Sequence, residues 1–179
     1  AYLAVVMGVL SLWPGPSEAA TVYRTLDAAL ADAFPGAVLR RDVLYPDGVQ
    51  RARAADLAGT KIPEPVYRYR AYRDGQLVGI AYPDRHRVRT LPETVLVVVG
   101  PAGAVRDVRV LAFAEPEEYL PARPWYEQFL GRTLDGDLRL NRGIDGVTGA
   151  TLTGRATTHC VRRALAIQQV FGAAGTDTP

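Results

Sequence analysis

The apolar residues of this chain change their period from one segment to the next, and each period predicts a different element. Residues 21–34 carry apolar side chains at helical spacing, at Val22, Leu26, Leu30 and Phe34. Pro35-Gly36 would end that helix. The following run "AVLRRDVLY" predicts a strand, and "DGVQRARAADLAG" predicts a short helix with Asp47 as its N-cap.

Strand-like alternation follows in the run "VYRYRAYR". Tyr67, Tyr69 and Ala71 share one face of this run, and Arg68 and Arg70 share the other. A period of two is typical of a half-buried β-strand. We therefore expect a strand with one face against the core.

Two turn signals connect this run to three further strand-like segments. Asp74-Gly75 predicts a hairpin turn into "QLVGIAYP". After the polar stretch "DRHRVRT", the run "ETVLVVVG" predicts a buried strand, and Pro101-Ala102-Gly103 turns it into "AVRDVRVLAFA". Two successive hairpins indicate an antiparallel sheet.

Helical patterns close the chain. The segment "PARPWYEQFLGRTL" predicts a short amphipathic helix, ended by Gly131, with Trp125, Phe129 and Leu130 packed on one side. A last helix is expected over about residues 153–171. The predicted fold class is α+β: a twisted antiparallel sheet with flanking helices, forming a single domain after an N-terminal export or anchor segment.

That N-terminal segment is the stretch "AYLAVVMGVLSLWPGPSEAA". Its first thirteen residues are almost wholly apolar, shorter than the roughly twenty needed to span a bilayer. The length suits the core of a secretion signal, and Ser17-Glu18-Ala19 offers a small-residue cleavage pattern. A longer upstream segment would make it a membrane anchor, and the alternative to both is a buried helix.

Both a secretion signal and a membrane anchor would place the rest of the chain outside the cytoplasm. An anchor would also keep the protein associated with the membrane through its N-terminus. We accordingly divide the chain into three parts. Residues 1–20 are a signal peptide or membrane anchor, residues 21–64 an N-terminal α/β extension packed on the domain, and residues 65–175 the main domain.

Composition limits the chemistry that the chain can perform alone. Its one cysteine, Cys160, excludes an internal disulfide and any cysteine-cluster zinc or iron–sulfur site. With His86 and His159 as the only histidines, a histidine-rich centre is not expected, and no metal site is predicted. Cys160 is expected in the core, because it shares a helix face with Ala164, Ile167 and Phe171. A borrowed cofactor would therefore supply any reaction chemistry.

Charge gives no indication of nucleic-acid binding. The net charge is +2, and the basic residues are scattered along the chain. Arg162 and Arg163 are expected on a solvated helix face. His159, which lies beside the apolar stripe, is expected to be exposed or to cap a contact.

Small and hydroxyl residues gather just before the last predicted helix, in "GIDGVTGATLTGRATTHC". Gly146 and Gly149 permit unusual backbone turns and close approach of a ligand. Unpaired N–H groups and the positive dipole end of a helix N-terminus together suit a phosphate. Arg155 could add positive charge nearby. The alternative is that Thr151 or Thr153 is simply an N-cap.

The stretch "DGVTGATLT" resembles the flavinylation motif of the FMN-binding domain family, which reads Asp, two variable residues, Ser or Thr, Gly, Ala, Thr. That family includes the FMN-carrying subunits of sodium-pumping NADH:quinone oxidoreductase and of the Rnf complex. The order of hairpins, aromatic helix, motif and closing helix is similar from about residue 67 to residue 167. This chain departs from the family in having "AEPEEYLP" where relatives commonly carry a Glu-Thr-Pro-Gly-like loop near the flavin ring.

The resemblance implies a site for each part of the cofactor. FMN would be joined by a phosphoester bond to the motif's last threonine, Thr151. A flavin transferase, with FAD as donor and Mg²⁺, would recognise the motif through Asp145, Gly149 and Ala150, with Thr148 in the Ser/Thr position. Glu115 and Tyr119 could stand in near the ring. The expected cofactor-binding residues are Asp145, Gly146, Thr148, Gly149, Ala150, Thr151, Leu152, Thr153, Glu115 and Tyr119.

The function implied is that of an extracytoplasmic electron carrier. Its redox partners would be a cytochrome, an iron–sulfur protein or a membrane quinone-linked complex, with no nucleic acid involved. A flavin-dependent reductase of a small substrate is one alternative, and a non-redox binding or regulatory module that keeps the fold is another.

Overall fold

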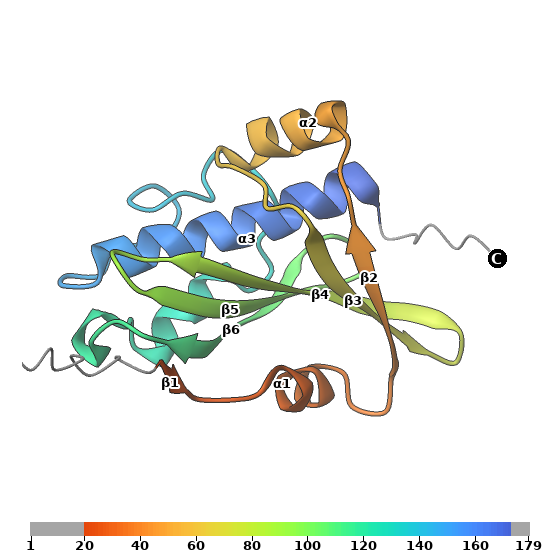
Figure 1. Ribbon diagram of the computed structural model, residues 1–179, viewed down its shortest axis with the longest axis horizontal. Helices are drawn as coiled ribbons and strands as arrows, with labels where there is room; N and C mark the ends of the chain where they lie inside the picture. Colours follow the sequence, from red (N-terminus) through yellow and green to blue (C-terminus); the bar gives the residue numbers. More distant parts are fainter. Residues whose placement is uncertain (1–19, 173–179) are drawn as a thin grey trace, which may run out of the picture.

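The computed structural model describes residues 20–172, and Figure 1 shows one sheet with helices on both sides. The export or anchor segment predicted over residues 1–20 lies outside the described residues except for Ala20. Between Ala20 and Gly172, no helix is both long and apolar enough to cross a membrane.

Six strands form one antiparallel sheet in the order β1-β6-β5-β4-β3-β2. The four inner strands, β3 to β6, are consecutive in sequence, and the two predicted hairpins join β3 to β4 and β5 to β6. The N-terminal region supplies both edge strands. The predicted α+β fold class with an antiparallel sheet is confirmed. The strands span Thr21–Val22 (β1), Val38–Leu44 (β2), Val66–Arg73 (β3), Gln76–Arg87 (β4), Pro92–Val99 (β5) and Val105–Phe113 (β6).

The helices lie in layers on the two faces of this sheet (Figure 1). The long helix α3, Thr151–Phe171, covers one face, and α1, Leu26–Ala33, covers the other. Helix α2, Gly48–Ala58, packs on the outer side of α3. Two 3₁₀ segments, η1 (Glu117–Tyr119) and η2 (Arg123–Phe129), follow β6.

Strand β5 shows why a continuous apolar run was needed in the middle of the sheet. Alternate residues face opposite sides of a strand. Val95 and Val97 accordingly join the cluster under α3, whereas Leu96 and Val98 join the cluster under α1. All four side chains are buried, because helices cover the sheet on both faces.

The first predicted helix was too long at its N-terminal end. Thr21 and Val22 pair with Phe113 and Ala112 of β6 as strand β1, and the helix begins only at Leu26. Thr25 caps it by accepting a hydrogen bond from Ala28 N at 3.3 Å. Val22, which fits the helical period, is 66% exposed.

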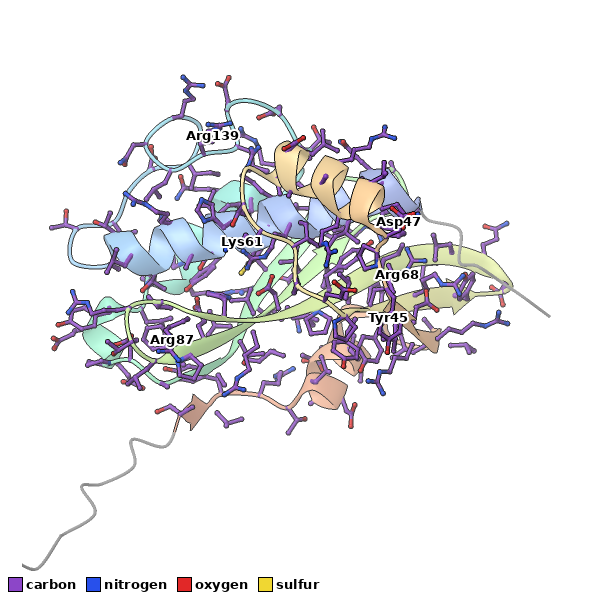
Figure 2. All side chains as sticks on the ribbon, turned by 45° about the horizontal axis from the view of Figure 1, so that its top comes forward. Tyr45, Asp47, Lys61, Arg68, Arg87 and Arg139 are labelled. Carbon is purple, nitrogen blue, oxygen red and sulfur yellow. The ribbon has the colours of Figure 1, made fainter. Side chains whose placement is uncertain are left out.

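The second predicted helix is confirmed. Asp47 is its N-cap, and a reciprocal hydrogen bond with Gln50 completes a capping box. Figure 2 shows Asp47 at the end of α2 where the chain arrives from β2. The last helix also exists, but it begins at Thr151 rather than Thr153.

The aromatic segment is a 3₁₀ helix whose aromatic side chains pack in the core. Trp125 makes edge-to-face contacts with Tyr126 and Phe129, at ring-centroid distances of 5.1 and 5.3 Å. The prediction that Leu130 packs beside them was wrong. The helix has ended at Phe129, and Leu130 is 47% exposed.

Two arginines are buried on the face of β3 that a polar pattern assigns to solvent. Asp42 lies directly opposite Arg68 across the β2–β3 pair, and its Oδ2 accepts hydrogen bonds from Nε of both Arg68 and Arg70 at 2.8 Å. Arg68 also donates to the carbonyl oxygen of Gly172, where the sheet meets the end of α3 (Figure 2). The sheet is therefore held to α3 through charged as well as apolar contacts.

Burial alone would raise the pKa of Asp42, but hydrogen bonds and charge from Arg70 and Arg68 outweigh it and hold the pKa below its ordinary value. A carboxyl group with a lowered native pKa stabilises the fold at neutral pH. That contribution is lost as the pH falls through the native pKa.

We predict that Asp42→Asn lowers the free energy of unfolding at pH 7 by about 3 kcal/mol, because the buried side chains of Arg68 and Arg70 lose the charge-assisted hydrogen bonds that they donate to Asp42. Urea unfolding measures the effect, with Asp56→Asn, at an exposed position of α2, as the control. The difference from wild type should shrink below about pH 4, where the Asp42 carboxyl of the unfolded chain takes up its proton while the native carboxyl, with its lowered pKa, stays ionised to lower pH. An equal stability of both variants at pH 7 would contradict the assignment.

Candidate functional site

A cavity of about 180 Å³ opens beside the N-terminus of α3. Three segments meet there: the connection after β4, the segment after β6 that includes η1, and the first turn of α3. The lining residues are Val88, Arg89, Glu115, Tyr119, Gly149, Ala150, Thr151, Leu152 and Thr153. Predicted site residues from two distant parts of the sequence are thus brought together.

The first turn of α3 lacks a side-chain cap. Its N-cap residue is Ala150, and no side chain bonds to the N–H groups of the turn from that position. The Thr153 hydroxyl donates instead to the carbonyl oxygen of Tyr119 at 2.6 Å, and the Thr151 hydroxyl to that of Val147 at 3.4 Å. The interpretation of Thr151 or Thr153 as an N-cap is therefore wrong, and the helix N-terminus can receive an anion.

Thr151 and Thr153 differ in exposure although both lie in this turn. Thr153 is 1% exposed and holds the η1 segment through its bond to Tyr119, whereas Thr151 is exposed. Gly149, just before the turn, has φ of +83°, and a Cβ added there would meet nothing within 4 Å. The approach to the Thr151 hydroxyl from this side is open.

Glu115 shapes the opposite wall of the cavity. Its Oε1 accepts backbone N–H bonds from Arg89, Thr90 and Leu91 at 3.1, 2.7 and 2.8 Å. Desolvation would raise the pKa of Glu115, but these hydrogen bonds outweigh it and keep the pKa below its usual value. The Glu115 carboxylate therefore fixes the connection between β4 and β5.

Arg89 brings a positive charge to the same wall. Its guanidinium carbon lies 5.0 Å from the ring centroid of Tyr119, within the range of a cation–π contact. Arg89 was not among the site residues predicted from the sequence. The signal available was its position in a polar stretch, "DRHRVRT", that joins two strands.

The N-terminal part of the motif, residues 145–148, does not contribute to the lining of the cavity. The backbone of Asp145 is fixed by Trp125 Nε1, which donates to its carbonyl oxygen at 2.7 Å, and by Gln128 Oε1, which accepts from its N–H at 2.8 Å. A Cβ on Gly146 would lie 2.6 Å from Asn141 Oδ1, which explains the glycine. Asp145, Gly146 and Thr148 are exposed.

An α+β domain with an uncapped helix N-terminus beside a cavity is suited to a ligand that carries a phosphate. Residues 91–166 match the FMN-binding domain family. The matched region is that of an FMN-binding domain, which supports a flavin-binding protein with FMN as its cofactor. No curated protein matches the chain in a sequence comparison.

The residues of the cavity fit this cofactor. The first turn of α3 offers N–H groups to a phosphate. The positive φ just before this turn favours glycine, so that Gly149 presents no side chain there. Arg89 adds positive charge, and Tyr119 adds an aromatic face. The matched region contains Glu115, Tyr119 and the whole of the motif.

We predict that Glu115→Ala speeds hydrogen exchange at the amides of Thr90 and Leu91 by about tenfold or more. A hydrogen bond to a charged acceptor contributes about 1.5–3 kcal/mol, and both amides lose theirs in this variant. Glu118→Ala, at an exposed neighbouring position, is the control and should leave the exchange unchanged. Unchanged protection in Glu115→Ala would contradict the role given to this carboxylate.

Proposed function

We propose that FMN is held covalently, by a phosphoester bond from its phosphate to Oγ1 of Thr151. The observation that carries this proposal is an exposed threonine hydroxyl in the first turn of an uncapped helix, within a domain of the FMN-binding family. Thr148 and Thr153 fit the role less well. Thr148 lies outside the cavity lining, and Thr153 is buried with its hydroxyl donated to Tyr119.

The attachment reaction would use FAD as the donor, with a flavin transferase and Mg²⁺. A bond forms between Thr151 Oγ1 and the phosphorus on the FMN side of FAD. The phosphoanhydride bond breaks, AMP leaves, and the threonine proton is released. The net gain is one FMN less one water. Exposure of Thr151 and the open approach beside Gly149 support access by a second protein.

In the mature protein we infer separate roles for the residues around the cofactor. The N–H groups of the first turn of α3 hold the phosphate. Arg89 offsets its negative charge, and Glu115 keeps the Arg89–Leu91 connection in place. FMN, when bound, supplies one- and two-electron exchange, and the protein orients it and sets its electrostatic surroundings.

We further propose that the protein is an extracytoplasmic electron carrier. The apolar residues 1–13, followed by Pro14-Gly15-Pro16, support export or anchoring. Covalent attachment suits that compartment, because a dissociated flavin would be lost there. The partners proposed are a cytochrome, an iron–sulfur protein or a membrane quinone-linked complex.

We predict that wild-type protein coexpressed with a flavin transferase gains the mass of one FMN less one water, and that Thr151→Ala does not. Intact-mass spectrometry and flavin fluorescence on a denaturing gel make the measurement. Thr151→Ser keeps a hydroxyl and should retain some modification. Thr133→Ala, an exposed threonine outside the motif, should be fully modified. An unmodified wild-type chain would refute the covalent link.

We also predict that the purified flavinylated protein can be reduced chemically and then reoxidised by a cytochrome, without sustained turnover of a small substrate. Absorbance of the flavin and of the cytochrome follows the transfer. Sustained turnover of a small acceptor would favour the reductase alternative. A protein that stays colourless after coexpression with the transferase would favour the non-redox binding module.

A further inference from the structure

A second group of polar side chains lies under α3, away from the cavity at its N-terminus. Asp84 and His86 reach it from β4, and Cys160 reaches it from α3. Asp84, His86 and Cys160 each offer one metal-ligand atom, and the three atoms lie within 4.8 Å of one another. The chain separates Cys160 from His86 by 74 residues, so no spacing in the sequence reveals the group.

The imidazole of His86 is oriented from both sides. Its Nδ1 lies 3.0 Å from Cys160 Sγ and 3.3 Å from Asp84 Oδ1, whereas its Nε2 lies 2.9 Å from Glu93 Oε2. A histidine that ligates a metal usually gives its other ring N–H to a carboxylate, which fixes the tautomer. Glu93, which is fully buried, occupies that position here.

We propose that Asp84 Oδ1, His86 Nδ1 and Cys160 Sγ bind a divalent transition-metal ion, with Zn²⁺ as the best match to this ligand set. Tetrahedral zinc with bonds of about 2.0–2.3 Å needs its ligand atoms roughly 3.3–3.8 Å apart. The observed separations of 3.0 and 3.3 Å therefore require only small outward shifts. The site is separate from the proposed flavin attachment and does not depend on it.

The fourth coordination position would be filled by water. A cavity of about 170 Å³ is lined by Asp84, Cys160 and Arg163, together with residues of β3 and the loop before it. It opens beside Asp84 and beside Cys160, which is otherwise buried. Three protein ligands and one open position are typical of zinc sites that are not purely structural.

Arg163 is compatible with the ion. Its Nε donates to Asp84 Oδ2 at 2.7 Å and its Nη2 to Cys160 Sγ at 3.1 Å, so it leaves Asp84 Oδ1 to face His86. Zn²⁺ would balance the charges of Asp84 and a Cys160 thiolate, to both of which Arg163 also donates. Glu93 Oε1 is buried without a hydrogen-bond partner.

The test is a Co²⁺ titration of the full, metal-free chain carrying no affinity tag. We expect saturation at one equivalent, with tetrahedral visible bands and a thiolate-to-cobalt charge-transfer band. Because Cys160 is the only cysteine, that band can arise only from this site. Zn²⁺ should then displace Co²⁺ and abolish the colour.

Variants separate the ligands from their neighbours. Cys160→Ser should remove the charge-transfer band, and Glu93→Gln should keep it but weaken the affinity about tenfold or more. His159→Ala changes the only other histidine and should bind Co²⁺ as wild type does.

Absence of saturable binding by the folded wild-type chain would overturn the proposal. So would a bound Co²⁺ without a thiolate band, or loss of the band in His159→Ala. The first two results do not depend on any variant that may unfold, because the wild-type spectrum alone decides them. Flavinylation of Thr151 is tested separately by intact mass, so failure of the metal proposal would leave the flavin proposal unaffected.

Discussion

Packing of one face of α3 against the sheet positions both the cavity at the N-terminus of this helix and the buried polar group under it. Val161 and Leu165 of α3 are buried in the same cluster as Val95 and Val97 of β5. Burial of each such side chain contributes about 1.5–3 kcal/mol. The helix is thereby fixed along its length, with Thr151 at one end and Cys160 nine residues further, about 13 Å along the axis at ~1.5 Å per residue. A shift of α3 would disturb the cavity and the buried polar group together.

Charged pairs complement the apolar packing in this structure. Asp42 with Arg68 and Arg70, and Asp84 with Arg163, place charges where the sheet meets α3. The prediction of a solvated face for Arg162 and Arg163 was wrong, because both are buried. Arg162 donates to the backbone carbonyl oxygens of Ala58 and Leu138. These contacts connect α2 and the loop before the motif to α3. Their directional geometry fixes how the layers are aligned, which apolar contacts alone do less well.

Local patterns predicted the elements well where one residue period dominated. The antiparallel hairpins, the Asp47 cap and the closing helix all follow from short-range signals. Errors arose where distant contacts decided the outcome. Thr21 and Val22 became a strand because β6 offered an edge, and Arg68 became buried because Asp42 faces it from β2.

In the candidate site, too, residues in a continuous motif could be predicted from the sequence, whereas residues brought together by tertiary packing could not. The motif from Asp145 to Thr153 is continuous in sequence and could be recognised there. Glu115 and Tyr119 came from a family resemblance, and the structure places both in the cavity lining. Arg89 and the contact of Cys160 with His86 could not be found from spacing, because tertiary packing brings them together.

The pairing of β1 with the end of β6 has a consequence for how the protein would meet its partners. Thr21 lies opposite Phe113, only two residues before Glu115 of the cavity wall. A bilayer anchor joined to the chain before β1 would thus act as a tether next to the proposed flavin site. Confinement to a surface raises the effective concentration of partners held in the same membrane. Diffusion in two dimensions, rather than affinity, would then govern the rate of encounter.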